Sequence, residues 1–122
     1  MTDRQYVCVA TRLRVRGPRV LPSFLAASAR VRGVARSSSG NVRTRLLGMP
    51  PFPVYFTLTV WESHDAMRAF VLTAEHRQAI AMMEAVARAG TFVEFTSPTP
   101  KVGWRTAMRH LRSTAAVRHQ PA

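Results

Sequence analysis

The sequence is poor in acidic residues and contains a single lysine. Its 122 residues hold 18 basic and 6 acidic side chains, for a net charge of +12, and Lys101 is the only lysine among the basic ones. The arginines are spread along the whole chain, and no basic run interleaved with aromatics occurs. Nucleic-acid binding is therefore not expected. A solvated arginine-rich surface is one interpretation of the charge, and attraction to an acidic substrate, partner or membrane surface is another.

Cysteine and long apolar runs are also scarce. The lone Cys8 cannot form an internal disulfide, and its place in an alternating segment predicts a small packed residue rather than a reactive thiol. No apolar run approaches the roughly 20 residues that span a bilayer, and no secretory signal pattern is found. We expect a cytoplasmic protein. The length is that of one domain, over residues 1–113, followed by a disordered basic tail at 114–122.

Several sequence signatures of catalysis are missing. The four histidines lie far apart and lack cysteine partners, so no metal site is expected. Nucleophile elbows, phosphate-binding loops and dinucleotide fingerprints are absent, and the acidic residues form no evident pair for hydrolysis. These absences exclude the enzyme classes that are recognised most readily from sequence.

Hydrophobic periodicity predicts an alternation of strands and helices. Period-two patterns predict strands, and apolar residues at helical spacing predict helices, the first of which should end near Gly33. A break at Thr73 should divide the second helical region, and Gly90 should end it. The predicted strands are 6–16, 42–48, 54–62 and 91–97, and the predicted helices are 21–33, 64–90 with its break, and 102–111.

The order of these elements predicts the fold class. A β-α-β-β-α-β order with an added C-terminal helix is the ferredoxin-like arrangement of an α+β protein. Helices on one face of a four-stranded sheet would leave the other face bare. Two such sheets can cover each other, so we expect a homodimer with a dimeric α/β barrel.

The segment from 54 to 80 concentrates the side chains that could form a site. Trp61 ends the best predicted strand, and Phe70 and His76 follow on an apolar helical stripe, which turns the His76 ring toward the sheet. Burial favours a neutral imidazole, which can act as a base or ligate haem iron. A purely structural histidine, bonded to a backbone carbonyl or a threonine, is the alternative, and Trp61 and Phe70 could be plain core residues.

The same segment resembles a known superfamily. The motif Thr-Leu-Thr-Val-Trp-Glu-Ser at 57–63, followed by Met67, Phe70 and His76, is similar to the strand-to-helix signature of dimeric α/β-barrel monooxygenases. This superfamily includes the antibiotic-biosynthesis monooxygenases. Within it, the chain looks most like spheroidene monooxygenase-like proteins, on a pattern that continues to Gly103-Trp104.

The resemblance implies a function and a set of site residues. It implies a monooxygenase that oxidises an apolar organic substrate, polyketide- or carotenoid-like, with haem as a cofactor bound through His76. His76 would then be the catalytic residue and the haem ligand. The substrate-binding side chains would be Trp61, Phe70, Met67, Phe56 and Leu58. The alternative is a non-catalytic dimeric module of the same fold that binds a small molecule, since no second polar catalytic group lies near His76 in the sequence.

Overall fold

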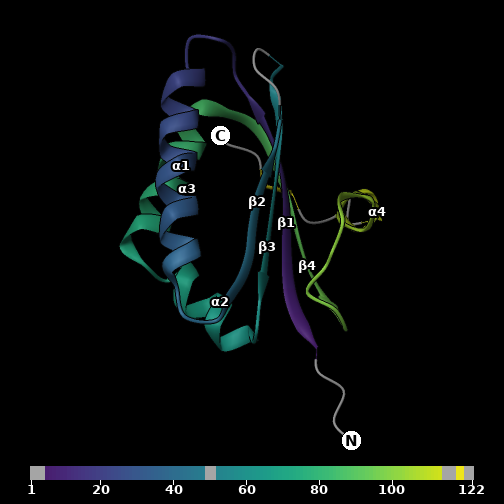
Figure 1. The fold of residues 1–122 in the computed structure, drawn as a ribbon. Helices are drawn as coiled ribbons and strands as arrows, with labels where there is room; N and C mark the ends of the chain where they lie inside the picture. The colour runs from purple at the N-terminus through teal and green to yellow at the C-terminus, as the bar shows by residue number, and fades with distance from the viewer. Residues whose placement is uncertain (1–4, 49–51, 114–117, 120–122) are drawn as a thin grey trace, which may run out of the picture.

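The computed structural model describes residues 5–48, 52–113 and 118–119, without the side chains of 87–89 and 118–119. Helices α1 (Leu21–Ser37), α2 (His64–Val71) and α3 (Ala74–Val86) cover one face of an antiparallel sheet, and α4 (Trp104–Ser113) lies on the other face (Figure 1). The strands are β1 (Tyr6–Val15), β2 (Asn41–Leu47), β3 (Val54–Trp61), β4 (Ala87–Ser97) and β5 (Arg118–His119). The α+β, ferredoxin-like prediction is confirmed.

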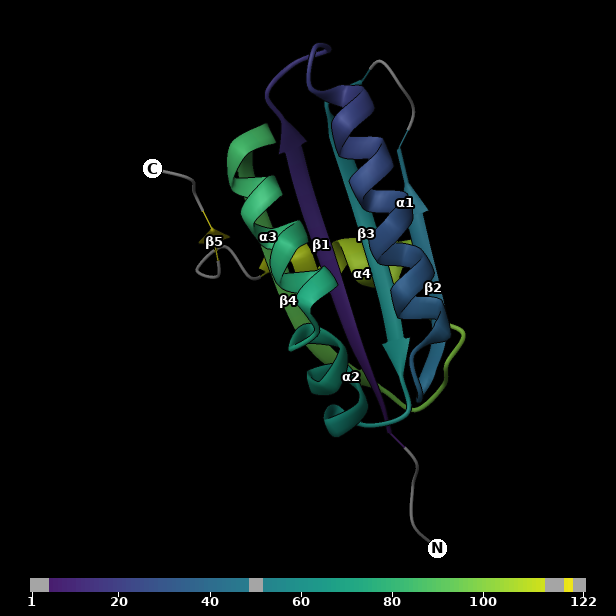
Figure 2. The same ribbon diagram turned by 90° about the vertical axis from the view of Figure 1, so that its left-hand side faces the viewer.

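Strand β1 is the centre of the sheet. The strand order is β2-β3-β1-β4-β5, and β1 pairs antiparallel with β3 and with β4. Seen from the helical side, α1 lies over β3 and β2, α3 lies over β4, and β1 runs between the two helices (Figure 2). The two-residue strand β5 pairs with Gly90 and Thr91 at the outer edge of β4. The rest of the predicted disordered tail lies outside the described residues.

Each long strand has two different faces because side chains alternate along it. On β3, Tyr55 and Trp61 face the three helices, whereas Leu58 and Val60 face α4. Together with Cys8 and other residues of β1 and β4, Leu58 and Val60 form an apolar cluster, which is closed by Val102 and by Ala107 and Leu111 of α4. The second face of the sheet is therefore partly covered within one chain, which corrects the expectation that it is bare.

Helix α1 is longer than the sequence predicted. It continues through Gly33 to Ser37, because Ala35 is buried and Val34 packs on the cluster around Trp61. This packing outweighs the cost of about 1 kcal/mol for a glycine inside a helix. Gly33 has open space around it and does not end the helix.

The boundary between α3 and β4 also differs from the prediction. The helix ends at Val86 and the strand starts at Ala87, whereas Gly90 was expected to end the helix. Gly90 instead pairs with Leu13 within the ladder between β1 and β4. The backbone hydrogen bonds of β1 thus extend the strand beyond what side-chain periodicity indicates.

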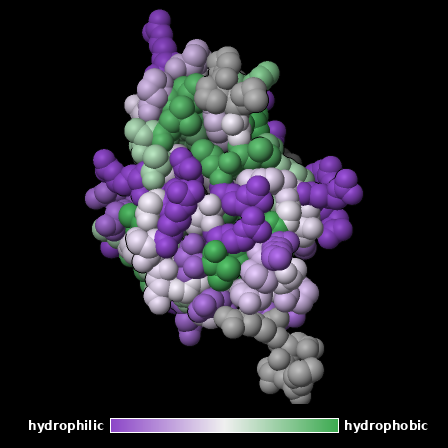
Figure 3. All heavy atoms as spheres, in the orientation of Figure 1, coloured by the Kyte–Doolittle hydropathy of each residue, from purple (hydrophilic) through white to green (hydrophobic). Residues whose placement is uncertain are grey.

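No helix in the described part of the chain combines the length and the apolar character that a membrane crossing requires. Hydrophilic side chains project from a wide band of the surface, between smaller apolar areas (Figure 3).

Candidate functional site

A cavity of about 460 Å³ lies between the helical face of the sheet and helices α1, α2 and α3. Its floor is made by side chains of β1, β2, β3 and β4, and its roof by side chains of the three helices. The volume is within the range of small-molecule sites, roughly 300–1,000 Å³. Three apolar residues of the wall, Val71, Ile80 and Phe92, are more than a third exposed, so the cavity opens to solvent beside them.

The inner wall carries a continuous series of aromatic rings. Trp61 stacks on Phe70 with ring centroids 5.2 Å apart, and Phe70 meets the His76 ring edge-on at 5.0 Å. Trp61 is completely buried, and its indole Nε1 has no hydrogen-bond partner among the described residues. Trp61, Phe70 and His76, which the sequence analysis placed together, all line this cavity.

The start of α2 is held tightly against the end of β3. The Ser63 hydroxyl accepts a hydrogen bond from the Ala66 amide at 3.1 Å and caps the helix. Gly40 has a φ of +85°, and a side chain at this position would collide with Ala66. The Gly40 carbonyl also accepts a bond from the Glu62 amide at 2.8 Å. These contacts fix the first turn of α2 and place Met67 and Phe70 over the cavity.

Thr73 joins α2 to α3 and positions His76. Its hydroxyl donates to the Phe70 carbonyl at 2.8 Å and accepts from the His76 amide at 3.2 Å. Burial lowers the pKa of the His76 ring, although a hydrogen bond to the Val71 backbone acts in the opposite direction. His76 is therefore a neutral imidazole at neutral pH, at the wall of an apolar cavity.

A polar stripe crosses the otherwise apolar wall. On the sheet it consists of the threonines Thr11, Thr44, Thr57 and Thr59; Thr11 and Thr57 are cross-strand partners, as are Thr44 and Thr59. On α1 it consists of Ser28 and Arg32, one helical turn apart. The Arg32 Nε is shielded from solvent and has no hydrogen-bond partner among the described residues.

Two residues that were grouped with this site lie elsewhere. Leu58 is fully buried in the cluster under α4, and Phe56 packs against the same cluster. Neither lines the cavity, because both have the opposite orientation on β3 from Trp61. Grouping Phe56 and Leu58 with the pocket was therefore wrong, whereas Met67 does line it.

Sequence reasoning also missed Ser28 and Arg32. Nothing in the sequence distinguishes Arg32 from the other sixteen arginines, and the predicted helix ended beside it. The informative signal was the spacing of Phe24, Ser28 and Arg32, which places two polar residues on the buried stripe of α1.

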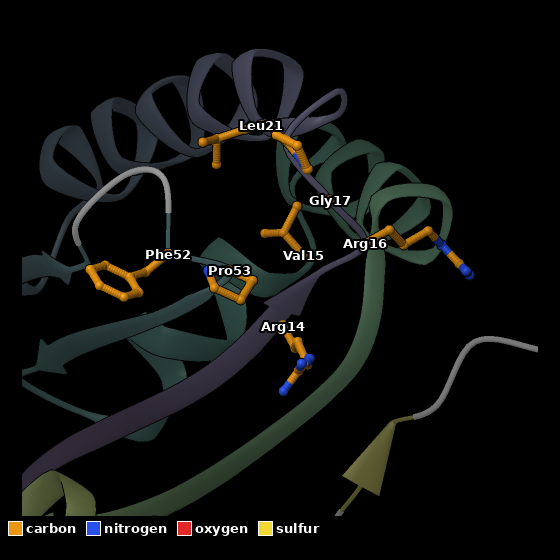
Figure 4. A pocket seen from close by; sticks show the side chains of 8 residues that line it. Arg14, Val15, Arg16, Gly17, Leu21, Phe52 and Pro53 are labelled. Atoms are coloured by element: carbon orange, nitrogen blue, oxygen red, sulfur yellow. The ribbon is translucent and has the colours of Figure 1, made fainter.

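Residues outside this cavity offer less scope for chemistry. Cys8 is fully buried, and burial raises the pKa of its thiol to about 11, which fits the prediction of a packed residue. Among the described residues, no group of three or more histidine, cysteine or carboxylate side chains could hold a metal ion. A shallower hollow of about 270 Å³ lies beside the end of β1, where the Arg14 and Arg16 side chains point in different directions (Figure 4).

Comparison with solved structures relates this architecture to known proteins. SnoaB from Streptomyces nogalater, described as a cofactor-independent oxygenase, matches with a TM-score of 0.65 at 23% identity over 76% of this chain and 93% of that one. The chain has the fold of the antibiotic-biosynthesis monooxygenase-like proteins. A putative antibiotic biosynthesis monooxygenase from Nitrosomonas europaea matches with a TM-score of 0.67 at 14% identity, over 80% of this chain and 93% of that one.

Rv0793 from Mycobacterium tuberculosis matches with a TM-score of 0.69 at 14% identity, over 80% of this chain and 99% of its own. No family model and no curated protein sequence matches. Identities this low establish the monooxygenase-like fold and leave the activity to be argued from the site. The closer resemblance to spheroidene monooxygenase-like proteins stays a prediction.

Proposed function

We propose that this chain is a monooxygenase that binds a small, largely apolar organic molecule in the cavity and oxidises it with O₂. The observation that carries the proposal is a neutral His76 at the wall of a largely apolar pocket, in contact with the aromatic series from Trp61. The oxygenase activity reported for SnoaB, which has the same fold, supports it.

The reaction can be balanced without an external reductant. His76 would take a proton from a C–H bond that a neighbouring carbonyl makes acidic, leaving a resonance-stabilised carbanion. The carbanion supplies the electrons that reduce O₂. One oxygen atom becomes a new carbonyl group, and the other leaves as water with the two hydrogens of the substrate. The substrate is thus the only reductant, and the protein provides a base, orientation and exclusion of water.

Haem is the cofactor that the sequence resemblance implied, with His76 as its ligand. The hydrogen bond from the His76 ring to the Val71 backbone would suit an axial ligand. The charges of the wall give haem little support, however, because they offer few cations to pair with its two propionates. Among the described residues, Arg32 is the only arginine or lysine that lines the cavity, and Glu94 adds a carboxylate. We therefore propose the reaction without haem.

A non-catalytic binding module of the same fold is the second candidate. It is favoured by the isolation of His76, whose described contacts are the Phe70 ring, the Thr73 hydroxyl and the Val71 backbone. A histidine held in this way can serve packing alone. Turnover of a substrate with uptake of O₂ separates the two candidates.

Anthrone is a suitable probe, because its methylene group is acidic and its oxidation by O₂ gives anthraquinone and water. We expect one O₂ consumed per anthraquinone formed, measured with an oxygen electrode and by chromatography. His76→Ala should lower kcat about 100-fold or more, as expected for loss of a general base. His64→Ala, which removes a half-exposed histidine, is the matched control and should keep the activity.

Two outcomes would overturn the proposal. Binding of anthrone by calorimetry with no acceleration of its oxidation, or of the oxidation of related polycyclic ketones, would indicate the binding module. Addition of haemin that produces a Soret band, lost in His76→Ala together with activity, would show that the reaction depends on haem.

We also propose that the protein forms a homodimer through the sheet, as the sequence predicted. Helix α4 covers the middle of the second face, so the partner would pack around α4 and against the edges of the sheet. Light scattering after size-exclusion chromatography measures this directly. A monomeric mass at about 10 µM protein would contradict the dimer.

A further inference from the structure

Arg32 is the polar residue whose placement the proposed reaction does not explain. It lies on the buried stripe of α1 between Ser28 and Ala35, both of which are buried, and it lines the cavity. A guanidinium stays charged at every physiological pH. Its Nε is shielded from solvent and has no acceptor among the described residues.

The Nε of Arg32 is an unpaired donor shielded from solvent, although the residue as a whole is only partly buried. A buried donor without an acceptor costs about 1–3 kcal/mol, and more when it belongs to a charged group. The described part of the chain provides no acceptor for Arg32 Nε, and a ligand in the cavity would supply one. Buried polar groups without partners are uncommon in native proteins, and such a group at a cavity wall indicates what the cavity is built to receive.

The carboxylate that lines the cavity, that of Glu94, lies on a different part of the wall. Glu94 lies on β4, 3.6 Å from the His64 ring, and both side chains are about half exposed. Its charge is therefore solvated, whereas Arg32 belongs to α1, which lies over β3 and β2 rather than over β4 (Figure 2). The Glu94 carboxylate does not neutralise Arg32 within hydrogen-bond distance.

We propose that the ligand of this cavity is a largely apolar molecule that carries one carboxylate, and that Arg32 binds this group. The planar fork of a guanidinium matches the two oxygens of a carboxylate, and a paired contact would satisfy Nε. The apolar rings from Trp61 to Phe92 would hold the rest of the molecule. That Arg32 selects a substrate rests on the proposed function. Binding of a carboxylate by Arg32 can be tested without turnover.

The net charge of +12 attracts any anion, so the test must separate the general field from the local contact. Arg36 provides the control, because it lies one turn further along α1 and is exposed. Arg32→Met and Arg36→Met remove the same charge from the same helix. Methionine keeps the length of the apolar stem at position 32.

The experiment measures binding of anthracene-2-carboxylate and of its neutral carboxamide to the full chain by calorimetry. The wild type should bind the carboxylate about tenfold to hundredfold more tightly than the carboxamide. In Arg32→Met this preference should fall to about twofold, with little change in the affinity for the carboxamide. Arg36→Met should keep the wild-type preference, and Arg32→Lys should keep part of it.

The thermal midpoint gives a second readout that a structural role of Arg32 would not produce. Arg32→Met should melt at the same or a higher temperature than the wild type, because it removes an unpaired buried donor. Equal affinity of the wild type for both probes, or equal loss of the preference in Arg32→Met and Arg36→Met, would overturn the proposal. If Arg32-dependent binding is found and O₂ uptake is absent, the carboxylate site stands and the monooxygenase proposal fails.

Discussion

Replacing Leu58 by alanine tests the assignment of the two faces of β3. Leu58 is completely buried under α4, in a cluster with Val60 and Ala107. Removal of a fully buried leucine side chain costs about 2–5 kcal/mol, including the cavity it leaves. For a domain of this size, 1 kcal/mol corresponds to roughly 4 °C in Tm, so Leu58→Ala should lower the Tm by about 8–20 °C.

Unfolding in urea, followed by circular dichroism at 15 °C, gives the change in free energy. Leu58→Met is the control, because it keeps the volume and should cost under about 1.5 kcal/mol. The affinity for anthracene-2-carboxamide should change less than twofold in both variants, since Leu58 does not line the cavity. A loss below 1 kcal/mol in Leu58→Ala, or a tenfold loss of affinity in the folded variant, would refute the assignment.

Three further predictions concern the elements around His76. Because burial lowers the folded-state pKa of His76, the unfolded chain takes up a proton first as the pH falls below about 6.5, and stability is lost there. His76→Asn should flatten this part of the stability–pH curve measured by urea unfolding, and an unchanged slope would contradict the buried ring. Thr73→Ala should cost about 1 kcal/mol, by loss of the cap of α3, with Thr73→Ser restoring most of it in the same assay. Gly40→Ala should lower the Tm, because Gly40 has a positive φ and an added side chain would collide with Ala66. Gly33→Ala, in open space, should raise the stability by about 0.4–1 kcal/mol. A more stable Gly40→Ala and a less stable Gly33→Ala would show that the turn is built differently.

The fold was predictable because alternation and helical spacing are strong in β1, β3 and α2. The break at Thr73 was also predicted, since it depends on local chemistry. The end of α1 and the start of β4 were not predicted, because each is set by contacts with residues far along the chain. Gly33 continues a helix that packs on the sheet, and Gly90 pairs with β1.

The site was predicted in its contiguous part only. Trp61, Phe70 and His76 lie within sixteen residues, so their spacing shows that they share a face. The role of Leu58 could not be read in the same way, because a strand covered on both faces gives no sign of which face adjoins the cavity. Arg32 reaches the cavity from another helix, and only the tertiary structure brings it there.

This division of the cavity wall has a consequence for how the protein can change. The aromatic rings and the base are encoded in one short segment whose geometry depends on Gly40, Ser63 and Thr73. The polar residues of α1 belong to a separate helix. Substitutions at positions 28 and 32 could therefore alter which molecule is accepted while the proton-accepting group stays in place. A scaffold of this kind allows selectivity and reactivity to diverge independently.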